Sequence, residues 1–201
     1  MWREIRFETL PLPDERSILE LLDALRNAFT NGGALLSCFH VHEHWAFDWL
    51  ASRNILHAWR GSVKPRFFEN FLTSAVVTGV LPELHLEGAL FDSPEFECLQ
   101  GNEMRTPSGF EWASAFTLDG EIAEQLVLGP MYGEFPGTPV EAKRLGEKFC
   151  EAVFEGRYTE VQVYRSYERW HEWFSYVESV SWLWIDKRHR RIWLLCITDT
   201  D

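Results

Sequence analysis

The segment Val180–Ile185 constrains the fold of this chain more than any other, because nearly all of its side chains are apolar. Successive side chains of a strand point to opposite faces, so Trp182 and Trp184 share one face while Leu183 and Ile185 share the other. A strand that is apolar on both faces belongs inside a sheet that is covered on both sides. The segment therefore predicts a central strand with packed structure above and below it.

The segment Arg191–Thr198 predicts the neighbour of this strand. It is also rich in apolar residues, and a short basic stretch, Lys187–His189, separates the two strand patterns. Short polar connections between two such patterns are typical of β-hairpins. We therefore expect a C-terminal antiparallel hairpin, with its first strand extending over Val177–Ile185.

Helical and strand patterns alternate without repeats over the rest of the chain. The strongest helix start is Thr138 followed by Pro139, with Glu141 placed to complete a capping box before a helix that stops near residue 156. Ser17 and Glu20 have the same spacing in an earlier helix. The other expected segments are strands at Ile5–Phe7, Ala34–Phe39, Glu83–Gly88 and Tyr158–Arg165, and helices at Glu43–Arg53, Pro65–Thr78 and Asp119–Leu128.

This order of elements predicts the fold class. Helices and strands are mixed and the chain closes on a hairpin, which favours an α+β fold with a mixed, mostly antiparallel sheet packed by several helices. The alternative is a three-layer α/β arrangement. A chain of 201 residues can bury a sizeable core without disulfides or metals, so we expect one globular domain over residues 1–201.

The charge of the chain indicates the kind of partner. The 31 Asp and Glu residues outnumber the 19 Lys and Arg residues, which gives a formal net charge of −12. Such a charge repels nucleic-acid phosphates and anionic membranes, whereas it attracts a basic protein and accelerates its approach. We therefore expect a basic protein partner, no nucleic acid and no membrane.

The N-terminal segment and the cysteines predict the compartment. Charges interrupt Met1–Glu8 where a secretory signal needs an apolar run, and no later run approaches the roughly 18 apolar residues of a membrane span. Cys38, Cys98, Cys150 and Cys196 are widely separated without CxxC spacing, as is typical of reduced, buried thiols. We expect a cytoplasmic protein.

Two segments are predicted to form a partner-binding surface. Trp170 and Trp173 lie among charged residues, so we expect them to be exposed together with Tyr176, because Trp and Tyr anchor many protein interfaces. The second segment, residues 83–103, is acidic and contains no Lys or Arg. Its predicted partner-binding residues are Glu83, Glu87, Asp92 and Glu95.

His40, His42 and His44 form the densest group of possible metal ligands in the sequence. In a strand their imidazoles share one face, and in a helix His40 and His44 lie one turn apart. Imidazole together with the Glu43 carboxylate suits zinc or iron, and zinc is the possible cofactor that the sequence suggests. The spacing matches neither HExxH nor HxHxDH, so the competing interpretation is a strand end that runs into a helix.

The favoured functional hypothesis is a non-enzymatic protein that covers the site of a basic partner, as an inhibitor or an immunity protein neutralises a toxin. The chain has no GxSxG, activated-thiol or P-loop pattern, and the basic stretch Lys187–Arg191 is short enough to be a charged hairpin turn. Two alternatives remain. One is a metal-dependent enzyme that uses the three histidines, and the other is a small-molecule binding module with a pocket lined by the same aromatic residues.

Overall fold

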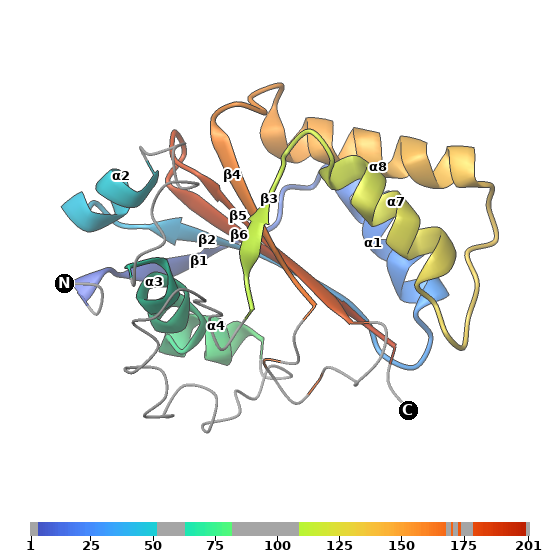
Figure 1. The fold of residues 1–201 in the computed structure, drawn as a ribbon, viewed down its shortest axis with the longest axis horizontal. Coiled ribbons are helices and arrows are strands. Elements are labelled where there is room, and N and C mark those ends of the chain that lie inside the picture. Colours follow the sequence, from blue (N-terminus) through green and yellow to red (C-terminus); the bar gives the residue numbers. More distant parts are fainter. Residues whose placement is uncertain are drawn as a thin grey trace.

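The computed structural model describes residues 4–51, 63–81, 109–167, 170, 173 and 179–199. Its strands form one six-stranded sheet in the order β1-β2-β6-β5-β4-β3, in which all neighbours are antiparallel (Figure 1). The strands are β1 (Phe7–Leu10), β2 (Gly33–Val41), β3 (Glu111–Ala113), β4 (Val161–Ser166), β5 (Val180–Asp186) and β6 (Arg191–Thr198). The helices are α1 (Arg16–Ala28), α2 (Trp45–Ala51), α3 (Val63–Leu72), α4 (Ala75–Val80), α7 (Leu118–Leu128) and α8 (Pro139–Phe154).

The strand β5 runs through the interior of the sheet, as the sequence predicts. Trp182 and Trp184 lie in a core that includes residues of α1, α7 and α8, whereas Leu183 and Ile185 lie in a second core with residues of α2, α3 and α4. Figure 1 shows these two groups of helices on opposite faces of the sheet. All residues of β5 are buried, so the strand is covered on both sides.

The fold class is α+β, which confirms the prediction. The C-terminal hairpin joins β5 to β6, and Asp186 faces Arg191 across its closed end. A three-layer α/β arrangement, the alternative, would also have helices on both faces of the sheet. The described sheet differs from it because it contains no parallel pair of strands. Antiparallel strands that are buried on both faces explain why β5 and β6 are nearly continuous apolar runs.

The helix α8 begins where its start signal predicts. The Thr138 hydroxyl oxygen accepts a hydrogen bond from the Glu141 backbone N–H at 3.3 Å, and the Glu141 carboxylate accepts one from the Thr138 backbone N–H at 2.7 Å. Pro139 occupies the first turn, where its missing N–H costs nothing. Glu155 follows the helix with a φ of 51°, and this left-handed conformation ends α8.

The helix α1 begins close to the predicted position, near Asp14 or Ser17, but the predicted capping box of Ser17 and Glu20 is wrong. The helix begins at Arg16, and its N-cap residue, Glu15, makes no capping hydrogen bond through its side chain. Ser17 therefore lies inside the first turn instead of capping it, and Glu20 pairs with Arg16 at 2.6 Å. An ion pair between residues four apart on a helix takes the place of the expected capping box.

The helix predicted over Pro65–Thr78 is divided into α3 and α4. Ser74 has an extended backbone, and its hydroxyl oxygen accepts a hydrogen bond from the Val77 backbone N–H at 3.4 Å. A serine in this position begins a new helix, because its side chain satisfies a backbone donor of the first turn. The strand predicted over Glu83–Gly88 lies outside the described residues.

Candidate functional site

Trp170 is not the exposed anchor that the sequence predicts. Its side chain is 0% exposed and packs against Phe110, with 5.9 Å between the ring centroids. The indole N–H donates a hydrogen bond of 2.9 Å to the hydroxyl oxygen of Ser181 in β5. This acceptor lets the whole indole enter the core, because a buried Trp needs a partner for its N–H. The prediction of an exposed Trp170 is therefore wrong.

Of the other predicted partner-binding residues, Trp173 alone lies among the described residues. Trp173 is half-buried and packs against the same core as Trp170. Tyr176 lies outside the described residues. The acidic residues Glu83, Glu87, Asp92 and Glu95 lie outside them too.

The three histidines lie at the end of β2 and the start of α2, as the strand-to-helix interpretation predicts. The rings of His40 and His42 meet edge to face with 5.4 Å between their centroids. The His42 ring nitrogen Nε2 lies 3.7 Å from the Glu8 carboxylate. The His44 ring nitrogen Nδ1 accepts a hydrogen bond from a backbone N–H of α2. Among the described residues, no three His, Cys, Asp or Glu side chains are placed to hold a metal ion, so the metal-enzyme alternative has no support there.

A buried ion pair ties the C-terminal hairpin to the connection between α8 and β4. Two Arg157 guanidinium nitrogens donate to the two Asp186 carboxylate oxygens, each at 2.8 Å. The His189 backbone N–H donates to the same carboxylate at 3.2 Å, and His189 Nδ1 lies 3.0 Å from it. Burial raises the pKa of Asp186, but the hydrogen bonds from Arg157 and His189 outweigh burial and lower this pKa overall. The cluster is a structural clamp whose charges are used within the fold.

Two other basic side chains of the hairpin turn, Arg188 and Arg190, also have acidic or carbonyl partners. Arg188 donates to Glu160 at 2.9 Å. Arg190 pairs with Asp48, and its guanidinium also donates to the carbonyl oxygen of Val41 at 2.9 Å. For Arg188 and Arg190, these contacts agree with the interpretation of a hairpin turn whose charges meet nearby acids.

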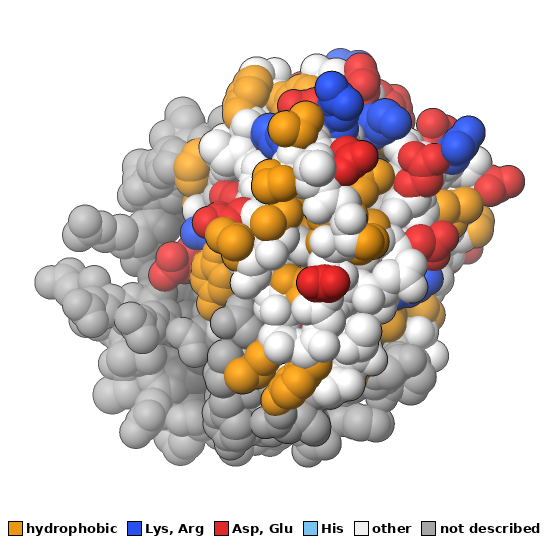
Figure 2. Space-filling model, turned by 90° about the vertical axis from the view of Figure 1, so that its right-hand side faces the viewer, with side chains coloured by type: hydrophobic (Ala, Val, Ile, Leu, Met, Phe, Trp, Pro, Cys, Tyr) orange, Lys and Arg blue, Asp and Glu red, His pale blue; other side chains and the backbone are white. Residues whose placement is uncertain are grey.

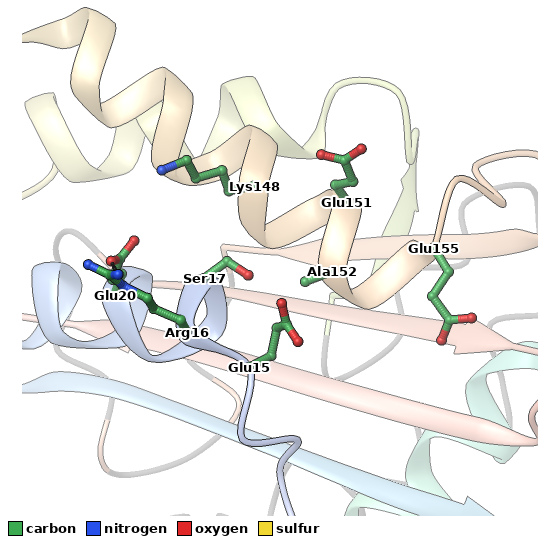
Figure 3. Close-up of a pocket in the computed structure, with 8 residues that line it drawn as sticks. All are labelled: Glu15, Arg16, Ser17, Glu20, Lys148, Glu151, Ala152 and Glu155. Carbon is green, nitrogen blue, oxygen red and sulfur yellow. Dashed lines mark hydrogen bonds and ion pairs between the residues drawn. The ribbon is translucent and has the colours of Figure 1, made fainter.

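A groove of about 660 Å³ lies between the start of α1 and the second half of α8. Its floor and walls combine residues that are more than a hundred positions apart in the sequence, and Figure 3 shows Glu15 and Ser17 facing Ala152 across it. The lining residues are Glu15, Arg16, Ser17, Glu20, Lys148, Glu151, Ala152 and Glu155. Four glutamates therefore share the groove with two basic residues.

The groove is acidic in effect as well as in composition. Arg16 is already paired with Glu20 at 2.6 Å, so it neutralises little else. Within the described part of the chain, Glu15 and Glu151 form no ion pair within 4.0 Å. Their charges face water and are open to a partner.

The position of Glu151 and Glu155 is unfavourable for α8 itself. Glu151 lies in the last turn and Glu155 follows it, and that turn contains no basic residue. The C-terminus of a helix carries partial negative charge, so acidic side chains there oppose the helix dipole. Glu151 therefore costs helix stability where it stands without an ion-pair partner among the described residues, whereas Glu155 lies 3.8 Å from Arg157.

A second exposed feature is the loop that leads into α8. The side chains of Met131 and Tyr132 are 54% and 46% exposed, yet their backbone N–H groups donate to the buried Asp199 carboxylate at 2.7 and 3.0 Å. Gly133 lies so close to α1 that a Cβ atom there would sit 2.1 Å from the carbonyl oxygen of Ala28. The loop backbone is thus fixed while its apolar side chains face outward.

Figure 2 shows the face formed by α1, α7 and α8, on which most of the charged side chains gather toward the upper edge. Hydrophobic side chains are spread over the rest of this face. Scattered apolar side chains are ordinary on a protein surface, so they define no site by themselves. The groove, in contrast, gathers an excess of negative charge in a concave surface.

Comparisons with protein-family models, with curated proteins and with solved structures find no significant match to this chain. None of the described helices is long and apolar enough to cross a membrane. Neither finding assigns a function.

The groove is not predictable from the sequence, because its two halves come from distant helices. One local signal was present: Glu151 and Glu155 stand at the C-terminal end of a strongly predicted helix, where acids are disfavoured. Nothing in the sequence shows that Glu15 lies across from them.

Proposed function

We propose that this chain is a binding protein for a basic protein, of the kind that inhibitors and immunity proteins represent, and that the groove between α1 and α8 receives basic side chains of the partner. The observation that carries the proposal is the excess of glutamates in the groove, where Glu15 and Glu151 form no ion pair among the described residues and Glu151 opposes the dipole of α8. Acidic side chains in a concave surface attract Lys and Arg, and excess negative charge over the whole chain steers a basic partner toward it.

The expected loss of affinity follows from the energy that each charge pair contributes. Exposed ion pairs contribute about 0.2–1 kcal/mol each, so removal of three groove charges should weaken binding by roughly tenfold. Much of this loss should be in the association rate and should shrink at high salt, because solvent-exposed charges act largely through steering.

The test compares three baits in affinity capture from cells of the source organism, with quantitative mass spectrometry. The baits are the wild type, the groove variant Glu15→Gln/Glu151→Gln/Glu155→Gln, and the control variant Glu43→Gln/Glu124→Gln/Glu134→Gln. Both variants lose the same charge, and the control residues are exposed glutamates outside the groove.

We expect a basic protein to be enriched by the wild type and by the control, and to be depleted about tenfold with the groove variant. Equal depletion with both variants would mean that overall charge matters and the groove does not. If the wild type enriches no basic protein, the proposed function is wrong.

A further inference from the structure

The acidic groove adjoins a second hollow, and Lys148 lines both. The second hollow has a volume of about 430 Å³ and lies beside the first half of α8. Its lining residues are Phe135, Pro136, Gly137, Glu141, Arg144, Leu145 and Lys148. The α8 residues of the two hollows recur at intervals of three or four, so they follow one face of the helix. From Glu141 to Glu155 this face is about 21 Å long, at about 1.5 Å per residue.

The second hollow has the opposite electrostatic character. Arg144 and Lys148 are one turn apart, and in the described structure neither forms an ion pair. Glu141 offsets part of this positive charge: its carboxylate accepts hydrogen bonds from the N–H and the hydroxyl of Thr138, and these bonds, with a smaller contribution from the charge of Arg144, lower its pKa. Like charges four residues apart repel each other on a helix, so this pair favours an anionic group between them.

The same hollow also offers apolar contact area. Phe135 and Leu145 are half-buried, pack against the core beneath α1 and α8, and keep part of their surface open to the hollow. A concave surface that combines a few charges with apolar walls is typical of sites that hold a peptide side chain. The two hollows thus differ in sign along one continuous helix face.

A second copy of the chain is a poor occupant for this surface. Each copy carries a formal net charge of −12, so two copies repel each other. A concave surface also requires a protruding partner, and an identical concave surface cannot fill it. The complementary occupant is a segment of a different protein.

We infer that the two hollows act as one groove that holds a single segment of the basic partner, with Lys or Arg at one end and an acidic residue beside an apolar one at the other. The basic end faces Glu15, Glu151 and Glu155, and the acidic residue lies between Arg144 and Lys148. This inference rests on the proposed function and adds the order of charges along the partner. An extended segment of about six or seven residues covers the distance, at about 3.3 Å per residue.

Two fluorescent peptides of about eight residues, long enough for the groove, test this order by fluorescence anisotropy with the full chain at low ionic strength. The first peptide has Lys and Arg at its start and Leu, Asp, Leu and Glu at its end. The second peptide has the same start and a Gly-Ser end. The protein variants are Glu151→Gln in the acidic hollow, Arg144→Gln in the second hollow, and Arg6→Gln as an exposed basic control outside both.

We expect Arg144→Gln to weaken the first peptide about threefold and to leave the second unchanged, as the loss of one exposed charge pair predicts. Glu151→Gln should weaken both peptides, and Arg6→Gln should weaken neither. If both peptides bind equally and Arg144→Gln changes neither, the inference is overturned while the proposed function stands. If neither peptide binds the wild type, the inference fails, and the capture experiment above then decides separately on the proposed function.

Self-association is measured in parallel by sedimentation of the wild type. We expect a monomer in the absence of peptide. A dimer that dissociates on Arg144→Gln would place a second copy in the groove and would overturn the inference.

Discussion

Replacement of Asp186 by Asn should lower the free energy of unfolding by about 3 kcal/mol. The Asp186 side chain is 2% exposed and that of Arg157 is 10% exposed, so both charges are largely removed from water. Removal of one partner of a buried ion pair costs about 3–5 kcal/mol. The lower end applies here because Glu155, 3.8 Å from Arg157, still offers a partial partner. For a domain of this size, about 3 kcal/mol corresponds to a loss of roughly 6–12 °C in Tm.

The assay is urea unfolding of the wild type, Asp186→Asn, Arg157→Met and the double variant, followed by tryptophan fluorescence and circular dichroism. The double variant leaves no unpaired buried charge, so the two effects should be less than additive, with a coupling of about 2 kcal/mol. The control is Glu160→Gln, which breaks the exposed pair with Arg188 and should change stability by less than about 1 kcal/mol.

The effect should also depend on pH in one direction. The pKa of Asp186 in the folded protein is lowered from 3.8, so the pair contributes its full stability above that pH. The difference between the wild type and Asp186→Asn should therefore be largest at neutral pH and shrink as the pH falls below 3.8. A variant within about 0.5 kcal/mol of the wild type at neutral pH would refute the argument from burial. A difference that grows on acidification would refute the sign of the pKa shift.

Three further predictions concern stability. Trp170→Phe should cost about 1–2 kcal/mol in urea unfolding, because it leaves the Ser181 hydroxyl without its donor; an unchanged midpoint would contradict the burial of this indole. Asp199→Ala should cost about 3 kcal/mol and speed hydrogen exchange at residues 131 and 132, because their N–H groups lose a carboxylate acceptor; unchanged exchange would contradict the anchor. Gly133→Ala should cost about 1–3 kcal/mol, because the new Cβ would lie 2.1 Å from the Ala28 carbonyl oxygen; a neutral effect would mean that the loop can shift.

The sequence predicts the central part of the fold because its signals there are local. The alternation in Val180–Ile185 places apolar residues on both faces of one strand, and the second hairpin strand, Arg191–Thr198, has the predicted bounds. The start of α8 at Thr138 follows from side-chain and backbone groups three residues apart. Such signals need no knowledge of the rest of the chain.

The errors arise where a distant contact decides the outcome. Trp170 has charged neighbours in the sequence, but Ser181 in β5 accepts its N–H and allows full burial. The candidate site escapes prediction for the same reason, because Glu15 and Glu151 line one groove only after α1 packs against α8. Periodicity shows which face of each helix is buried, but it does not show which two helices are neighbours.

Zero-length cross-linking of the complex with a carbodiimide shows whether the partner occupies the groove, because this reagent joins a carboxylate to an amine only when the two are in contact. The cross-linked residues are then identified by mass spectrometry. We predict links from Glu15, Glu151 or Glu155 to lysines of the partner. Links that involve only acids outside the groove, such as Glu124 or Glu134, would contradict binding in the groove.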